Sequence, residues 1–93
     1  MRDDQFEWDD RKAARNANRH RVTFEAARLA FEDPRAIDRL DLDEPDEERM
    51  LLTGLANDVL LTVCFAERGH RIRIISARKA TRREQGDHNS QAS

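Results

Sequence analysis

The side chains best suited to chemistry are cationic, and many of them lie in residues 67–84, which read ERGHRIRIISARKATRRE. Arginine binds phosphate well because its planar guanidinium donates two parallel hydrogen bonds to a pair of oxygen atoms. Arg73 lies between isoleucines in the middle of an expected strand, where a long cation needs water, a carboxylate partner or a ligand. Arg78 lies where that strand is expected to end and a helix to begin. These two arginines are therefore the first candidates for holding a phosphate group.

Three further residues can transfer protons. His20 and His70 can titrate near neutral pH, and Glu67 can act as a base if its surroundings raise its pKa. Each also has a purely structural role open to it. His20 can be the cation at a helix end, His70 an ordinary turn residue, and Glu67 the ion-pair partner of Arg68. Both interpretations stay open at the level of the sequence.

The sequence contains no motif for a metal or a cofactor. It has no glycine loop of the phosphate-binding type and no Cys/His cluster with zinc spacing. The acidic residues 43–48 lack EF-hand spacing and contain no histidine, so a solvated loop is the better interpretation. The single cysteine, Cys64, lies in the most apolar segment and is expected to be a core side chain and not a nucleophile. We therefore expect neither a metal nor a cofactor.

Residues 59–84 predict the centre of the fold. The run Val59–Phe65 is almost continuously β-branched and aliphatic, as in a strand that is buried on both faces. Gly69 can supply the positive φ of a tight turn, and Thr81 and Glu84 have the spacing of a helix capping box. From residue 71 the side chains should alternate between an open face and a core face. The open face is expected to carry Arg71, Arg73, Ile75 and Ala77, and the core face Ile72, Ile74, Ser76 and Arg78.

The first half of the chain predicts a short strand, two helices and further strands. Alanines and arginines favour the first helix, Thr23 is a good cap for the second, and Pro34 ends it. Ile37 is expected to face the core from the strand that follows. In order, we expect a strand at 5–8, helices at 10–20 and 24–31, strands at 36–42 and 49–55, and a turn at 56–58.

These elements predict an α+β fold. The expected architecture is a single small domain, residues 1–85, with an antiparallel sheet of about four to five strands, two N-terminal helices and a short C-terminal helix. Residues 86–93 contain poor helix formers and no periodicity, so we expect a disordered tail. No apolar run is long enough to cross a bilayer and no signal peptide is recognisable, which favours a cytoplasmic protein without membrane contact.

Charge is arranged in blocks. The formal net charge is only −2, which argues against a simple nucleic-acid-binding arm. The first helix and residues 68–83 are nevertheless basic, whereas residues 32–48 are strongly acidic. Such blocks can simply solvate a small domain, or they can form a surface that binds phosphates. Because the fold can bring the two basic blocks together, we give both interpretations about equal weight. The candidate phosphate-binding residues of the two basic blocks are Lys12, Arg15, Arg19, Arg71, Lys79 and Arg82.

Two sequence blocks also carry a family resemblance. FEWDDRKAARNANRHRVTFEAARLAFEDP and ERGHRIRIISARKATRRE, with EERMLLTGL between them, resemble the BrnT family of ribonuclease toxins of bacterial type II toxin–antitoxin systems. The resemblance covers roughly Phe6 to Glu84. It implies a RelE/ParE-like fold and a cognate antitoxin that resembles BrnA, which itself contacts operator DNA, so that the toxin reaches DNA only indirectly. The family usually has glycine where this chain has Arg21.

The resemblance implies an endoribonuclease that works without a metal. Such cleavage needs a base for the ribose 2′-hydroxyl, cations for the charge that builds on the phosphate, and an acid for the leaving 5′-oxygen. Arg73 and Arg78 are the expected phosphate ligands, and His20 or Glu67 the expected proton-transfer groups. The alternative is a catalytically inactive partner-binding or corepressor module with the same fold. Arg21, the absence of tyrosine and the short final helix make this alternative plausible.

Overall fold

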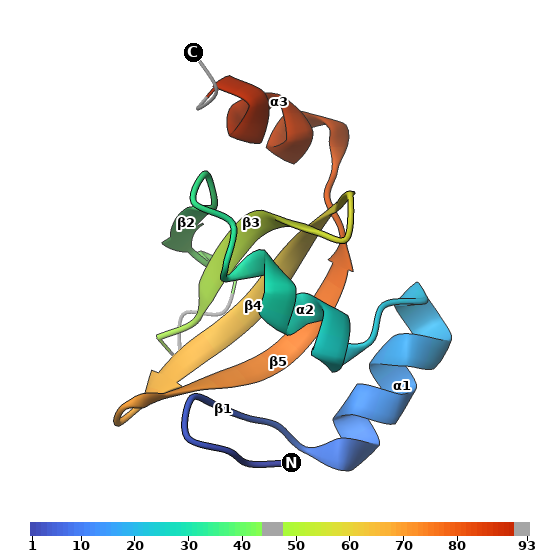
Figure 1. The fold of residues 1–93 in the computed structure, drawn as a ribbon, viewed down its shortest axis with the longest axis vertical. Coiled ribbons are helices and arrows are strands. Elements are labelled where there is room, and N and C mark those ends of the chain that lie inside the picture. Colours follow the sequence, from blue (N-terminus) through green and yellow to red (C-terminus); the bar gives the residue numbers. More distant parts are fainter. Residues whose placement is uncertain (44–47, 91–93) are drawn as a thin grey trace.

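A five-stranded sheet organises the protein, and the computed structural model describes residues 1–43 and 48–90 (Figure 1). The strand order is β1-β5-β4-β3-β2. Neighbouring strands are antiparallel except that β1 runs parallel to β5, so the sheet is mixed where an antiparallel one was expected. The elements are β1 (Phe6–Glu7), α1 (Asp10–His20), α2 (Phe24–Ala30), β2 (Ile37–Leu40), β3 (Met50–Ala56), β4 (Val59–Arg68), β5 (Arg71–Lys79) and α3 (Arg82–Ser90).

The centre of the sheet is the predicted hairpin of β4 and β5. Gly69 has a φ of 63°, which confirms the tight turn expected there. The hairpin between β3 and β4 turns at Asn57 and Asp58, both with positive φ, as a turn whose twist matches that of the flanking strands requires. The buried strand predicted from residue 59 is therefore confirmed, and it extends to Arg68.

A β-bulge in this hairpin corrects the predicted alternation of β5. Phe65 pairs with Ile74 but Cys64 pairs with Ser76, so Ile75 is an extra residue on β5. The two faces therefore exchange after Ile75. Ala77, expected opposite the core, is 1% exposed and joins Ile74 in the core. The prediction was wrong because it assumed an uninterrupted strand. One inserted residue moves every later side chain of the strand to the opposite face of the sheet.

Helix α2 crosses one face of the sheet and forms the core with it, and α1 lies beside β5 (Figure 1). Phe24, Val63 and Ile74 are among the most buried side chains. Phe31 makes edge-to-face contacts with the rings of Phe6 and Phe65, at centroid distances of 5.4 and 5.0 Å. The expected burial of Ile74 is confirmed, and the half-buried Ile72 packs against the same core.

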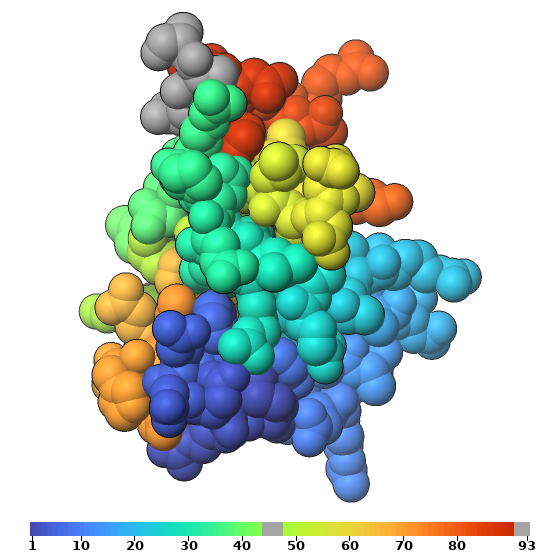
Figure 2. All heavy atoms as spheres, in the orientation of Figure 1, coloured from blue at the N-terminus to red at the C-terminus, as the bar shows by residue number. Residues whose placement is uncertain are grey.

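The last helix is longer than the sequence indicated. The capping box is confirmed, because Thr81 N–H donates to Glu84 Oε1 at 2.8 Å and Glu84 N–H donates to Thr81 Oγ1 at 3.2 Å. Helix α3 then continues to Ser90, past the expected boundary at residue 85. Figure 2 shows α3 at one end of the molecule, beside the β3–β4 turn and away from α1.

Candidate functional site

The face of the sheet that α1 and α2 leave uncovered carries most of the candidate chemistry, and we call it the open face. Cross-strand partners share a face. Arg73 pairs with Ala66 and Arg78 pairs with Thr62, and these partners lie four residues apart on β4, so both arginines point to the open face. The bulge makes this possible, because an unbroken alternation would have put them on opposite faces. Further residues of this face are Arg39, Thr53 and Cys64.

A hollow at the β4–β5 hairpin end brings several predicted residues together. Its volume is about 350 Å³. Arg73 and Glu67 both line it, and Lys12 lines it from α1. Glu67 pairs with Ile72 and Arg73 with Ala66, so the two side chains leave the hairpin on opposite faces and share the hollow only at its end. Arg73 Nη1 also lies 3.7 Å from Glu7 Oε2 on the neighbouring strand β1. The hollow is lined by Lys12, Glu48, Arg49, Ala66, Glu67, Arg68, Arg73 and Ile75, so cations outnumber carboxylates around it.

Asn16 explains how α1 is positioned beside this hollow, and sequence reasoning missed it. Its side-chain amide forms two hydrogen bonds with the backbone of Ala77 on the edge of β5. It donates to Ala77 O at 2.8 Å and accepts from Ala77 N–H at 3.1 Å. It also donates to Val22 O at 2.9 Å, and it is buried. Helix α1 therefore lies along β5, where Asn16 makes the pair of hydrogen bonds with Ala77 that a neighbouring strand would otherwise make. The sequence does hold a sign of this role, because Asn16 lies between Ala13 and Ala17 on the alanine-lined face of the helix, where a polar side chain is unexpected.

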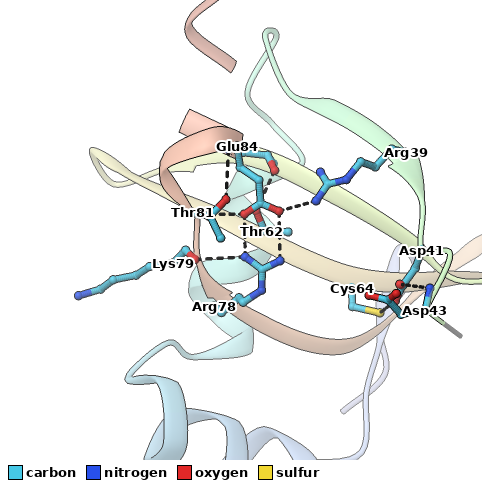
Figure 3. A network of polar contacts seen from close by, with 10 residues as sticks. Arg39, Asp41, Asp43, Thr62, Cys64, Arg78, Lys79, Thr81 and Glu84 are labelled. Atoms are coloured by element: carbon cyan, nitrogen blue, oxygen red, sulfur yellow. Dashed lines mark hydrogen bonds and ion pairs between the residues drawn. The ribbon is translucent and has the colours of Figure 1, made fainter. Parts of the chain in front are cut away.

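Arg78 lies at the other end of β5 and is engaged by Glu84 (Figure 3). Arg78 Nη1 donates to Glu84 Oε1 at 2.7 Å, and Nη2 donates to Oε2 at 3.1 Å. Arg39 of β2 donates to Oε2 from the far side, and the Thr62 hydroxyl also bonds to this carboxylate. Burial alone would raise the pKa of the Glu84 carboxyl, but the bonds from Arg78, Thr81 and Arg39 outweigh it and hold that pKa well below its usual range. The bond from Glu84 likewise raises the pKa of Arg78. Sequence reasoning assigned Glu84 only to the capping box.

The remaining candidate residues are more dispersed. His20 is half-buried at the end of α1, about 12 Å along the helix from Lys12 at 1.5 Å per residue, and it does not line the hollow. Arg71 Nε donates to Asp3 O at 2.8 Å. His70 lines a separate hollow with Phe6. The exposed candidates are Arg15 and Arg19 on α1, Lys79 at the end of β5 and Arg82 at the start of α3.

Cys64 is buried on the open face, where its Sγ lies 3.8 Å from Asp41 Oδ2. Burial, reinforced by the negative charge of Asp41, raises the pKa of this thiol to about 11. It is therefore protonated at neutral pH and a poor nucleophile. Within residues 1–43 and 48–90, no three His, Cys, Asp or Glu side chains gather as metal ligands. No helix in this part of the chain is long and apolar enough to span a membrane.

Comparison with known proteins gives one informative result. No match was found among curated proteins. A family model described as the ribonuclease toxin BrnT of type II toxin–antitoxin systems matches residues 8–84. The match begins at Trp8, runs through α1 and the whole sheet beyond it, and ends at Glu84. The chain therefore belongs to the BrnT family of ribonuclease toxins of type II toxin–antitoxin systems.

Proposed function

We propose that this protein is an active toxin that cleaves RNA without a metal, on the open face of its sheet. The observation that carries the proposal is the hollow that Arg73, Lys12 and Glu67 line together with further cations. Cations fixed around a hollow of this kind attract a phosphodiester and stabilise the charge that develops on it during cleavage. A carboxylate beside them can accept a proton from a 2′-hydroxyl.

Within this proposal the catalytic residues have different parts. Arg73 binds the scissile phosphate, and Glu67 is the better placed candidate for proton transfer because it lines the same hollow. His20, the other candidate, lies further along α1 and would have to act on RNA that extends past the hollow. Arg78 lies about 14 Å from Arg73 along the sheet, judged from partners four residues apart on β4. Arg78 can bind the scissile phosphate only if its side chain extends toward Arg73. Otherwise it binds a neighbouring phosphate of the same RNA molecule.

The other basic residues extend this surface. Arg15 and Arg19 are exposed on α1, which lies along β5, and Lys79 is exposed at the end of that strand. We infer that these cations, together with Lys12, Arg71 and Arg82, bind the RNA backbone without reading its sequence. The partner that neutralises the toxin is proposed to be a BrnA-like antitoxin that contacts operator DNA itself. We propose that the protein acts in the cytoplasm, where it would meet both the RNA and the antitoxin.

Arg73→Ala tests the proposed site. Loss of a preorganised cation at the reacting phosphate lowers the rate by on the order of a hundredfold, so purified Arg73→Ala should cleave RNA that much more slowly than wild type. The matched control is Arg35→Ala, which removes the same charge from an exposed loop position after α2. Its rate should stay within about twofold of wild type, and circular dichroism should show both variants folded.

Three results would contradict parts of this proposal. Cleavage by Arg73→Ala at the wild-type rate would place the site elsewhere. Loss of cleavage in EDTA would exclude a metal-free mechanism. A folded wild-type protein that leaves RNA intact and still binds an antitoxin would support the alternative of an inactive partner-binding module.

A further inference from the structure

Glu84 occupies a site that is built to hold an anion. Its carboxylate receives hydrogen bonds from three strands and from the backbone: Arg39 of β2, Thr62 of β4, Arg78 of β5 and Thr81 N–H (Figure 3). The Glu84 side chain is 6% exposed, whereas those of Arg39 and Arg78 are 44% and 38% exposed. The two guanidinium groups therefore converge on one carboxylate from the edges of an opening toward solvent.

The helix that delivers this carboxylate is held almost entirely by polar contacts. Helix α3 has the sequence RREQGDHNS, which contains no apolar side chain, and its buried residues are Glu84 and His88. His88 Nε2 lies 2.7 Å from Asp33 Oδ2, after the end of α2. Movement of such a helix exposes little apolar surface to water, so it forfeits little hydrophobic stabilisation.

We propose that Arg39, Arg78 and Thr62 form a phosphate-binding site, and that Glu84 is an internal occupant which an RNA phosphodiester displaces when α3 moves away. This inference rests on the proposed function for the identity of the ligand. A phosphodiester presents two non-bridging oxygens that share one negative charge, as a carboxylate does, and a guanidinium binds both groups with the same pair of parallel N–H donors. The exchange therefore conserves charge and most hydrogen bonds.

The tethered carboxylate competes strongly with a free ligand. A group attached through a short stretch of chain acts at an effective concentration in the millimolar range, so a weakly bound phosphate must exceed that value to displace it. In the free protein, Glu84 thus keeps the site closed to small anions. A polyanion that is already bound at the Arg73 hollow presents its next phosphates at a similarly high local concentration.

Removal of the competing charge tests the inference. The probe is a 2′-O-methyl RNA hexamer, which lacks the 2′-hydroxyl nucleophile and stays intact, and a second arm uses inorganic phosphate alone. Glu84→Gln keeps the shape of the side chain and should bind the hexamer at least tenfold more tightly than wild type at low salt. The control is Asp87→Asn, which removes the same charge from an exposed residue that lines the same hollow as Arg39 and Glu84. It should change the affinity by less than twofold, and Arg39→Ala in the Glu84→Gln background should remove the gain.

The outcomes separate this inference from the proposed function. Equal affinities of Glu84→Gln and Asp87→Asn for the hexamer would overturn the site, even if the wild-type protein cleaves RNA. Tighter binding of inorganic phosphate to Glu84→Gln, with no RNA cleavage by wild type, would support the site and contradict the function. If Glu84→Gln does not fold, hydrogen exchange of wild-type amides 82–90 decides the matter. Saturating hexamer should speed their exchange, and unchanged or slower exchange would overturn the inference.

Discussion

Arg21 adopts a backbone conformation that suits glycine better than arginine. It follows α1 with φ 60° and ψ 30°, and its N–H donates to Ala17 O as the C-terminal cap of the helix. The left-handed region brings Cβ close to the following carbonyl oxygen and costs a non-glycine residue about 1 kcal/mol or more. A glycine at this place would adopt the same conformation without that cost. The chain adopts this conformation with an exposed arginine.

Arg21→Gly should consequently stabilise the protein. Relief of the left-handed strain should raise the free energy of unfolding by about 1 kcal/mol, which corresponds to an increase in melting temperature of roughly 5 °C for a domain of this size. Arg19→Gly is the matched control, because it makes the same chemical change two residues earlier at an exposed position inside the helix. It should lower the stability by about 0.5–1 kcal/mol. A lower melting temperature for Arg21→Gly would show that the arginine side chain contributes more than its backbone conformation costs.

At the scale of elements, α2 is seated directly on β3 through Gly54. A Cβ atom added at Gly54 would lie 2.4 Å from the carbonyl oxygen of Ala30, the last residue of α2. The next residue, Leu55, donates its N–H to Asp33 Oδ2 at 2.8 Å. Asp33 also binds His88, so a single carboxylate joins the end of α2 to β3 and to α3. The absence of a side chain at residue 54 therefore sets the spacing of α2 and β3, and Asp33 links both to α3.

Gly54→Ala should destabilise the protein by about 1–3 kcal/mol, because the obstructing atom belongs to the backbone and α2 must move to admit the methyl group. Gly86→Ala is the control. Nothing lies within 4 Å of a Cβ at Gly86 in α3, so the same change there should be neutral or stabilise the helix by up to about 1 kcal/mol. Chemical denaturation of both variants measures the difference. Equal stability of Gly54→Ala and wild type would show that α2 is not seated as closely as described.

At the scale of the whole molecule, the open face and α3 are joined by carboxylates that must stay ionised. The pKa of Glu84 lies well below its ordinary value of 4.5. The pKa of Asp33 lies below its ordinary value of 3.8, because hydrogen bonds from Arg35 N–H, Leu55 N–H and His88 outweigh the opposing effect of burial. A carboxyl whose folded pKa is depressed binds fewer protons in the folded state than in the unfolded state. These groups therefore stabilise the fold above pH 5, and their contribution is lost as the pH falls toward and below their folded pKa values.

Acid should accordingly weaken the fold, and Glu84 should account for much of the effect. The melting temperature of the wild-type protein should fall steadily between about pH 5 and pH 3, because the unfolded chain takes up more protons over this range. Glu84→Gln has no carboxyl to titrate there, so its melting temperature should start lower and depend less steeply on pH. Asp87→Asn should follow the wild-type slope, since the exposed Asp87 has no hydrogen bond or ion pair among the contacts of α3 described above. Parallel curves for wild type and Glu84→Gln would exclude Glu84 as a main source of the acid sensitivity.

The sequence determined the elements and most of their local boundaries, with the end of α3 as the exception. Helix α1 begins and ends where the alanine and arginine pattern predicted, the turns at residues 57–58 and Gly69 lie where their residue types indicated, and the capping box of Thr81 and Glu84 forms. These features depend on contacts between residues close together in the chain, such as caps, turns and alternating side chains, and they leave a direct mark on the sequence. The family could also be recognised from two blocks of local sequence, and its identification is confirmed.

Tertiary structure decided which side chains meet. The bulge at Ile75 arises from pairing between two strands, so the alternation of β5 alone could not predict that Arg73 and Arg78 share a face. Asn16 replaces a strand at the edge of β5 only because the chain brings α1 there, 61 residues away in sequence. Glu84 meets Arg39 across 45 residues and His88 meets Asp33 across 55, and these contacts anchor both the first and the last turn of α3 although its residues are poor helix formers. A buried hydrogen-bond network is fixed by long-range geometry, and local residue patterns do not encode which distant donor completes it.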